Sequence, residues 1–414
     1  MVNETVVSQH AEEAAFLWTL RNRAVGEPHY SLDDLAALDE RVEAHLDGLT
    51  IAGDVGWKFC RENLANEGPG EVFALAVLAF GAGDRARMLE ALQAGCASPL
   101  VTPGLISALG WLEDTSVSPW IAKLLEARSA SHRAVGIAAS AIHRTDPGPA
   151  LTAAVQDDDP TLRARALRAV GELRRHDLAG HLRGRVADAD DSCRFWATWS
   201  LALNGHRDAV ALLTTWFERN DAFSDRALHV ALRAMALDES RGWISTLARD
   251  PRLIRLAVIG AGIVGDPASV PWLIRRMDTP ALARLAGEAF SMITGADLSY
   301  EDLDQDEPLA AGRDEETSID KVLALDYESN LRWPASRRVA EWWERNHQRF
   351  GEGTRYLAGE PLAAESALHV LKVGKQRQRA AAALELALLN RDRALFEMRA
   401  RAVEQCKRLS VWNS

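Results

Sequence analysis

The stretch DPTLRARALRAVGEL, residues 159–173, decides the fold of this chain. Its apolar residues Leu162, Ala166 and Val170 are four positions apart, which is the spacing of one face of an α-helix. Thirty-one residues after the start of this stretch, DDSCRFWATWSLAL begins at Asp190 with the same layout. A helical segment that recurs at such an interval is typical of a repeat protein.

An arginine and an aspartate recur along the chain with a period close to 30 residues. The arginines follow one another at steps of 30, 31, 32, 29 and 29 residues, and the aspartates at steps of 31, 31, 30 and 28. Two residue types that keep one period and one phase are hard to obtain by chance. The arginines are Arg133, Arg163, Arg194, Arg226, Arg255 and Arg284, and the aspartates are Asp146, Asp177, Asp208, Asp238 and Asp266.

We expect this ladder of arginines and aspartates to be structural. Each arginine would bond the aspartate of a neighbouring repeat, or the free carbonyl groups at a helix end. The alternative is that the arginines form a stripe that binds phosphate or carboxylate groups.

Each repeat is predicted to consist of two short helices joined by a turn. The turn carries the aspartate, which is a good N-cap for the second helix. Pro147 and Pro267 directly follow their aspartates, at the first helical position, where a missing N–H costs nothing. Such a helix pair cannot bury its apolar face alone, so stacked repeats share a continuous core. The sequence therefore predicts an all-α fold, a right-handed α-solenoid of helical-hairpin repeats with helical caps.

The segment LAVIGAGIVG, residues 256–265, has the glycine spacing of a dinucleotide-binding turn. A nucleotide site would need a strand at 256–259 and a helix that continues past Gly265. Pro267 and Pro271 would then lie inside that helix, at a cost of about 3 kcal/mol each. The repeat register instead predicts a helix followed by a turn, so we interpret these glycines as part of a repeat.

The repeat pattern resembles HEAT-like repeats, including those of the phycobilin-lyase type. The similarity rests on an arginine after a D-P-x-x turn, on A-L-x-x-V-G-E-L and on a G-D-P-x-x-V-P-x-L turn, and it covers residues 70–295. It implies the fold and says little about function, because HEAT-like arrays serve many partners.

The flanking segments are similar to an uncharacterised bacterial HEAT-like family. That family has no assigned activity and is loosely associated with secretion-apparatus gene neighbourhoods. The resemblance implies a protein-binding role, with secretion cargo as one candidate client. The similar segments are AEEAAFLW (11–18), YSLDDLAALDERVEAHLDGL (30–49), AGEAFSMITGADL (286–298) and GKQRQRAAAALELAL (374–388).

We expect four parts along the chain. Helices are predicted near 9–22 and 31–47, and an amphipathic helix at 335–349. Loops as long as the third part are usually functional or disordered. The parts are an N-terminal helical cap (1–69), the HEAT-like solenoid (70–295), an acidic irregular insertion (296–334) and a C-terminal helical cap (335–414).

Charge is distributed unevenly over the chain. The net charge of −11 divides into −8 over residues 1–296, −10 over 297–328 and +7 over 331–414. The acidic stretch is either a solvated loop or a docking segment for a basic surface. That surface could belong to a partner protein, or to this chain at Lys372, Lys375, Arg377 and Arg379.

The acidic stretch supplies five candidate partner-binding residues. Its start resembles a calcium loop, but the run 300–308 lacks the glycine and the closing glutamate that such a loop needs. We therefore expect no calcium site there. The candidates are Glu301, Asp302, Asp304, Asp306 and Glu307.

The composition is that of an ordinary folded protein. Apolar residues make up 47% of the 414 residues and charged residues 26%, and no apolar run reaches the length of a membrane span. The four cysteines form no C-x-x-C pair, and the first thirty residues lack a basic-then-apolar leader. We expect a cytoplasmic protein.

Motifs that carry chemistry are absent from the sequence. There is no P-loop, no G-x-S-x-G and no pair of histidines at helical spacing, so we expect no enzyme, no cofactor and no metal. Trp196 and Trp199 are further candidate partner-binding residues, because a base could stack on them as in HEAT-like alkylpurine glycosylases. Packing between repeats is the expected role, since a DNA-binding enzyme should show a basic stripe.

The sequence thus favours a non-enzymatic scaffold that binds a protein partner as an adaptor, a chaperone or an inhibitor. The alternative is a HEAT-like nucleic-acid-binding protein or a DNA glycosylase-like enzyme. Nucleic acid is the less expected partner, because the repeat region is acidic. No pattern indicates an oligomeric state.

Overall fold

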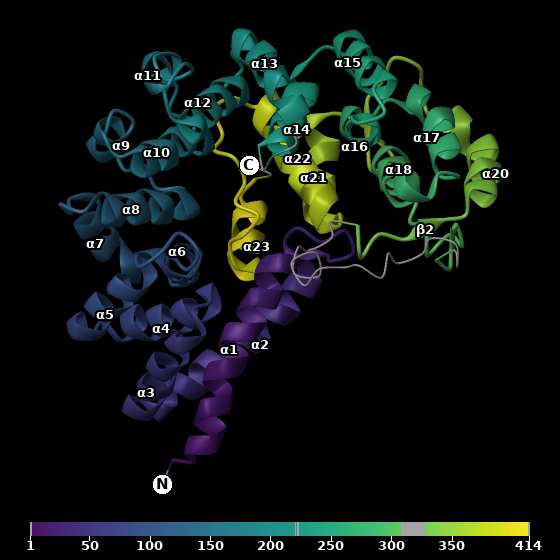
Figure 1. Cartoon of the computed structure of the whole chain (residues 1–414). Coiled ribbons are helices and arrows are strands. Elements are labelled where there is room, and N and C mark those ends of the chain that lie inside the picture. The colour runs from purple at the N-terminus through teal and green to yellow at the C-terminus, as the bar shows by residue number, and fades with distance from the viewer. Residues whose placement is uncertain (1, 220, 222, 308–327, 413–414) are drawn as a thin grey trace. The chain divides into compact units, whose positions relative to one another are not determined.

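The structure is a computed structural model that describes residues 2–219, 221, 223–307 and 328–412. Nearly all regular structure in these residues is helical, and the strands there are limited to two antiparallel pairs. Helices follow one another in hairpins along the chain, as Figure 1 shows. The predicted all-α fold of stacked helical hairpins is confirmed.

The chain forms two compact units. Unit 1 comprises Met1–Gly26, Tyr30–Asn204 and Arg391–Ser414, and unit 2 comprises Glu27–His29 and Gly205–Asn390. Unit 1 therefore takes its last segment from the C-terminus, after nearly all of unit 2 in the sequence. The division into four parts that we made from the sequence stays a prediction.

Unit 1 contains thirteen α-helices in its described residues. The first two are longer than the helices predicted near 9–22 and 31–47, because each extends the same amphipathic pattern. The elements are α1 (Glu4–Ala24), α2 (Leu32–Ala52), α3 (Asp54–Asn63), η1 (Leu64–Asn66), α4 (Pro69–Ala82), α5 (Arg85–Gly95), α6 (Thr102–Trp111), α7 (Asp114–Leu125), α8 (Ala130–His143), α9 (Pro149–Ala154), α10 (Pro160–Glu172), η2 (His176–Leu178), α11 (Ala179–Arg183), α12 (Asp191–Leu203) and α23 (Ala402–Ser410).

Unit 2 continues the hairpins and adds two small strand pairs. Among the helices that the structure describes, none offers an apolar stretch of membrane-spanning length. The elements are α13 (Arg207–Leu213), η3 (Thr214–Arg219), α14 (Ser224–Ala234), α15 (Leu237–Arg249), α16 (Ile254–Val264), η4 (Pro267–Ser269), α17 (Val270–Arg276), α18 (Pro280–Thr294), β1 (Asp304–Gln305), β2 (Trp333–Pro334), α20 (Ser336–Asn346), η5 (His347–Arg349), β3 (Tyr356–Leu357), β4 (Glu360–Pro361), α21 (Ala364–Val373) and α22 (Gln376–Leu389).

Aspartates define where several helices begin. Asp159 and Asp190 precede α10 and α12, and each accepts the backbone N–H of the third helical residue, at 2.9 and 2.8 Å. Asp266 accepts a backbone N–H in the same way at the start of η4. Such a cap stabilises a helix by about 1 kcal/mol. The two stretches that revealed the repeat therefore begin at true helix starts.

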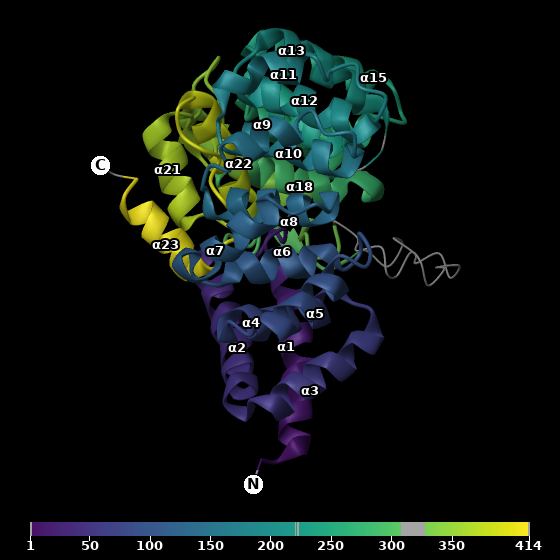
Figure 2. The ribbon, with the colours of Figure 1, turned by 90° about the vertical axis from the view of Figure 1, so that its left-hand side faces the viewer.

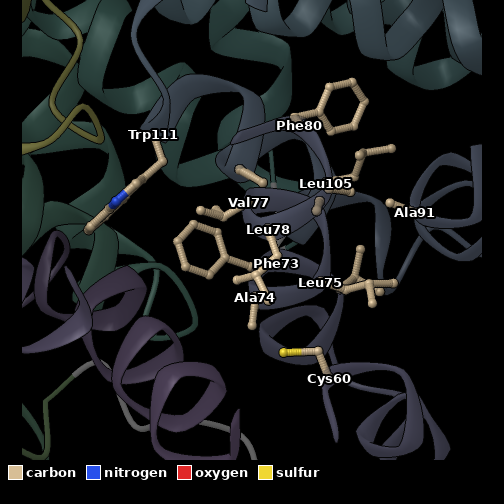
Figure 3. Close-up of a cluster of buried hydrophobic side chains, with 14 of the residues drawn as sticks. Cys60, Phe73, Ala74, Leu75, Val77, Leu78, Phe80, Ala91, Leu105 and Trp111 are labelled. Atoms are coloured by element: carbon tan, nitrogen blue, oxygen red, sulfur yellow. The ribbon is translucent and has the colours of Figure 1, made fainter. Parts of the chain in front are cut away.

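The inner layer of unit 1 is built from α4, α6, α8, α10 and α12, which pack against one another in sequence order (Figures 1 and 2). Phe73, Leu75 and Leu105 are fully buried in this layer, as Figure 3 shows. Burying one such side chain stabilises the fold by about 1.5–3 kcal/mol. Gly104 permits close approach of α6 to α4, because a Cβ there would lie 1.9 Å from the carbonyl oxygen of Pro69.

The matching layer of unit 2 consists of α14, α16 and α18. The β3–β4 hairpin lies across the C-terminal ends of two of these helices. The Tyr356 N–H donates to the Gly265 carbonyl at 2.7 Å, and the Ala358 N–H donates to the Met292 carbonyl at 2.7 Å. The hairpin therefore satisfies backbone carbonyls that the helices leave unpaired.

Residues 256–264 lie in α16, and Gly265 ends that helix with a φ of 72°. A Cβ on Gly262 would lie 2.8 Å from the Ala289 Cα, so this glycine lets α16 and α18 pack closely. A dinucleotide site would need a strand where the helix lies. The interpretation of LAVIGAGIVG as part of a helical repeat is confirmed.

Several inner helices end at a residue with positive φ, and neighbouring positions of this kind are about 30 or about 60 residues apart. Glycine adopts this conformation at no steric cost, whereas another residue loses about 1–2 kcal/mol. Arginine at two of these positions therefore needs a compensating interaction. The positions are Gly83 (67°), Arg144 (60°), Arg174 (59°), Gly205 (89°), Gly265 (72°) and Gly295 (73°).

The insertion predicted to be irregular contains one strand pair. Asp304 pairs with Pro334, and Gln305 pairs with Trp333. Two-residue strands carry no periodic pattern, which is why the sequence did not predict them. The amphipathic helix predicted at 335–349 is α20, and residues 308–327 of the acidic stretch lie outside the described residues.

Candidate protein-binding site

The first three arginines of the ladder lie at the starts of α8, α10 and α12. Arg133 donates to Asp157 at 2.7 Å, and Arg163 binds both carboxylate oxygens of Asp188 at 3.0 Å. Arg194 donates to the Asp188 carbonyl at 2.7 Å. These guanidinium groups fix the loops that lead into successive inner helices. They use aspartates outside the predicted ladder.

The other three arginines belong to unit 2. Arg226 is exposed on α14. Arg255 donates to the Ala281 carbonyl at 3.0 Å and to the Glu328 carboxylate. Arg284 donates to the Glu328 carbonyl at 2.9 Å. Arg255 and Arg284 therefore both bind Glu328, the last residue of the acidic stretch.

In unit 1 the ladder aspartates share an arginine of the turn. Asp146 and Asp177 both accept from Arg175, at 2.6 and 2.7 Å. The Arg175 guanidinium holds the pKa of the Asp177 carboxyl below its usual range, mainly through this hydrogen bond. Arg175 thus ties two successive turns together.

The same arrangement recurs in unit 2. Asp238 and Asp266 accept from Arg241, at 3.1 and 2.6 Å. Asp208 lies exposed in the first turn of α13. Four of the ladder aspartates thus contact arginines of the turn or of the second helix of a repeat. That the ladder as a whole is structural stays a proposal.

The two candidate tryptophans lie together on α12. Trp199 is only 6% exposed, and its ring centroid is 5.4 Å from that of Trp196. Trp196 is half-buried, with the Arg168 guanidinium 4.7 Å from its ring centroid. Trp199 therefore packs inside the helical layer, and one face of Trp196 already carries a cation.

The described acids of the acidic stretch contact unit 2 itself. Asp302 accepts from Arg338 of α20 at 3.0 Å, and Glu301 accepts from the Trp342 indole N–H. Ser299 donates to Asp304 at 2.6 Å. These contacts bring the start of the acidic stretch against α20.

The last two candidates lie at the edge of the described residues. Glu307 is 3.5 Å from Arg284 of α18, and Asp306 is exposed. Of the basic residues considered as an internal docking surface, Arg377 donates to Glu288 at 2.7 Å. Arg379 is fully buried and donates to the Leu371 carbonyl at 2.8 Å.

The sequence did not predict that helices of unit 1 bind a non-helical segment from the end of the chain. We call residues 391–401 the C-terminal segment. It runs in a non-helical conformation beside α12, α10 and α8 before α23 begins (Figure 1). Arg21 of α1 donates to the carbonyls of Arg399 and Ala400, at 2.6 and 2.7 Å, and to Asp39 at 2.7 Å. Helices at the start of the chain therefore bind the main chain of its end.

The two arginines with positive φ bind the same segment. Arg144 donates to the Leu395 carbonyl at 2.6 Å, and Arg174 donates to the Arg393 carbonyl at 3.1 Å. The Leu395 N–H in turn donates to the carbonyl of Glu172 at 2.9 Å. These contacts supply the interaction that arginine in a left-handed conformation requires. Arginine in place of glycine at the repeat's helix end was the signal available in the sequence.

Side chains anchor the segment as well. Phe396 is buried, with its ring centroid 5.3 Å from that of Trp412. The Glu397 carboxylate is 3.1 Å from the Arg144 guanidinium, and both side chains are largely buried. We call the surface around Arg21, Arg144 and Arg174 the seat of the C-terminal segment. This seat binds main-chain carbonyls, one aromatic ring and one carboxylate.

A buried glutamate organises the cations around this seat. Burial alone would raise the pKa of Glu172, but Arg165 at 3.0 Å and Arg168 at 2.7 Å lower it to about 2. Its carboxylate is therefore ionised at neutral pH and holds both guanidinium groups in place.

A cleft of about 470 Å³ lies in unit 1 where the C-terminal segment ends. We call it the open cleft. Arg401, the last residue of the segment, lines it together with α2 and the ends of α4 and α6. The remaining lining residues are Glu43, Leu46, Asp47, Leu49, Thr50, Gly53, Val77, Leu78, Gly81, Ala82, Arg87, Trp111, Leu112 and Glu113.

Unit 2 has a cavity of about 380 Å³ between α18 and the start of α22. Its wall includes the ion pair of Glu288 and Arg377. Burial raises the pKa of Glu288, although Arg377 opposes this effect. Within the described part of the chain, no group of three or more histidine, cysteine or acidic side chains is placed to hold a metal ion.

Comparison with known proteins bears on the repeats. A family model described as HEAT repeats matches residues 148–236, a range that contains the helices from α9 to α14. No curated protein matches the chain. The match supports a HEAT-like repeat protein, and HEAT repeats in general are protein-interaction scaffolds.

Proposed function

We propose that this protein is a scaffold that binds a protein partner as an adaptor, a chaperone or an inhibitor. The observation that carries the proposal is the seat of the C-terminal segment. Helices of unit 1 hold a non-helical stretch of polypeptide there through arginine contacts to main-chain carbonyls. A surface that holds one such segment has the chemistry to hold another.

Main-chain recognition suits a scaffold for physical reasons. Carbonyl groups are common to every peptide, so arginine donors supply affinity without demanding a particular sequence. Pockets for individual side chains then supply specificity. A cytoplasmic location and a secretion-related client belong to this proposal as its finer points, and they rest on composition and on the family resemblance.

The nucleic-acid alternative has less support. A base would need an exposed aromatic face, whereas Trp199 is buried and Trp196 lies beneath Arg168. The repeat region is also acidic, and phosphate backbones are bound by basic surfaces.

The test is affinity capture with the tagged full chain from its own organism at moderate salt, followed by cross-linking and mass spectrometry. A scaffold should recover one protein in near-stoichiometric amount, cross-linked to residues of the helical layers. Recovery of nucleic acid or a small molecule without any protein would overturn the proposal.

A further inference from the structure

The open cleft continues the path of the C-terminal segment. Arg21, which holds the carbonyls of Arg399 and Ala400, lies 5.7 Å from the ring centroid of Trp111. Arg401 lies 5.8 Å from the same ring. The segment thus runs up to Trp111 and turns into α23, while the cleft extends beyond it along α4 and α6.

The floor of this cleft is apolar. Leu46, Val77, Leu78 and Trp111 line it, and each keeps only 4–8% of its surface exposed. A volume of about 470 Å³ falls within the range of sites that bind small ligands, and it accommodates one or two large side chains.

The rim of the cleft carries uncompensated negative charge. Glu43 is paired with Arg401, and Arg87 is paired with Asp54. Asp47 and Glu113 are exposed, and neither carboxylate has a hydrogen bond or ion pair with another described residue. Both residues line the cleft, so their carboxylates favour a cationic side chain at its rim.

Helix ends add to this potential. Carbonyls at the C-terminus of a helix favour a nearby cation. At the ends of α8 and α12 the chain supplies that cation itself, because Arg144 donates to the Ala141 carbonyl and Arg174 donates to the Leu203 carbonyl. At the end of α4 the equivalent position is Gly83, and α6 is followed by Leu112. The residue that follows each of these two helices is therefore uncharged, and the two arginines that line the cleft, Arg87 and Arg401, are each paired with a carboxylate.

We infer that the open cleft binds an extended segment of the partner protein, with an apolar side chain on the floor and a lysine or arginine at the rim. This inference deepens the proposed function and rests on it. The partner's cation takes the place that Arg144 and Arg174 hold further along the same row of helix ends.

Gly81 provides a steric test within the intact chain. It lies on α4 and lines the cleft, and the nearest atom to a Cβ built there is the Leu112 Cδ2 at 3.8 Å. Gly81→Leu therefore fills the cleft without a clash against the backbone. Gly81→Ala is the matched control, because it makes the same gain in helix propensity and leaves most of the cleft open.

The probe is a library of random dodecapeptides displayed on phage, selected on the full chain. Enriched peptides are then synthesised with a fluorophore, and their dissociation constants are measured by fluorescence anisotropy. We expect peptides with an apolar residue beside lysine or arginine, at least about tenfold weaker binding to Gly81→Leu, and unchanged binding to Gly81→Ala.

Charge reversal tests the rim separately. Asp47→Lys should weaken the same peptides by about tenfold at low salt. Glu126→Lys is the control, since Glu126 is an exposed acid of unit 1 outside the cleft. Circular dichroism of each variant verifies that it is folded.

Three outcomes overturn the inference. They are the absence of any enriched peptide, enrichment of acidic peptides, and equal binding of enriched peptides to the wild-type chain and Gly81→Leu. If affinity capture recovers a partner that Gly81→Leu also retains, the scaffold stands and the cleft is excluded as its site.

Discussion

Arg144 and Arg174 are held in the left-handed conformation, which costs about 1–2 kcal/mol each. Their guanidinium groups bind carbonyls of the C-terminal segment, and hydrogen bonds to charged groups contribute about 1.5–3 kcal/mol each. The bonds outweigh the strain. Four other inner helices have glycine at the corresponding position, where the left-handed conformation costs nothing.

Replacement of Arg174 by glycine should loosen the C-terminal segment. Arg174→Gly relieves the backbone strain but removes the donors to Arg393 and to the Leu203 carbonyl. We expect the Leu395 amide, which is bonded to Glu172, to exchange its hydrogen about tenfold faster or more. Hydrogen exchange with mass spectrometry measures this rate.

The control relieves the same kind of strain elsewhere. Glu67 is exposed and has a φ of 55°, so Glu67→Gly should slightly stabilise unit 1 and leave the segment protected. Unchanged exchange at Leu395 in Arg174→Gly would contradict the role assigned to Arg174.

His229 makes the stability of unit 2 depend on pH. Burial lowers the pKa of His229 to about 4, and Arg233 and Arg377 act in the same direction against Asp225. The unfolded chain then binds the proton more readily, with a pKa near 6.5. Stability from this residue is therefore present above pH 6.5 and is lost as pH falls from 6.5 towards 4.

Chemical denaturation at pH 7 and pH 5, followed by tryptophan fluorescence, checks this dependence. The wild-type chain should lose more stability between the two pH values than His229→Gln does. His369→Gln is the control, because His369 is exposed on α21. An equal pH dependence of all three proteins would disprove the assignment.

At the scale of elements, glycines set the distance between inner helices. Gly262→Ala should destabilise unit 2 by about 1–3 kcal/mol, because its Cβ would overlap Ala289 on α18. Gly242 on α15 is exposed, and a Cβ there meets nothing within 4 Å. Gly242→Ala should therefore stabilise the helix by up to about 1 kcal/mol. Opposite shifts of the urea midpoint are expected, and shifts of the same sign would refute this packing argument.

At the scale of the whole molecule, unit 1 is completed by residues that follow unit 2. The Ala402 N–H donates to Asp39 at 2.6 Å, and Arg21 bonds both Asp39 and the C-terminal segment. The ends of the chain are therefore interdependent in unit 1, although nearly all of unit 2 separates them in the sequence.

A chain that ends at Asn390 should lose protection in unit 1 and keep it in unit 2. Removing the segment leaves the buried Arg21 without two of its carbonyl partners, which is destabilising. Hydrogen exchange should accelerate in α1, α8 and α10 and stay unchanged in α16 and α18. Equal acceleration in both units would mean that the C-terminus does not belong to unit 1 alone.

Periodicity predicted the repeats because local physics determines them. Asp159 and Asp190 cap helices wherever they occur, and the spacing of apolar residues sets the buried face of each helix. The glycines of LAVIGAGIVG were assigned correctly for the same reason, since Pro267 forbids the alternative helix.

Contacts between residues distant in the sequence could not be predicted in this way. Arg133 and Arg163 bind Asp157 and Asp188, which lie 31 residues apart and each 11 residues after a predicted aspartate. Periodicity alone therefore did not show which of the two aspartate series the arginines would bind. Nor did it show the hydrogen bond between Glu301 and Trp342, which joins the acidic stretch to α20.

By itself the sequence determined an all-α chain of helical hairpins with a period close to 30 residues, because caps, turns and helical faces depend on neighbours a few positions away. Only the tertiary structure decided that residues 391–401 return to unit 1 and that the open cleft lies beyond them. Those features depend on guanidinium groups and carbonyls that are hundreds of residues apart, as in the bond from Arg21 to Ala400, and no local pattern encodes such a meeting.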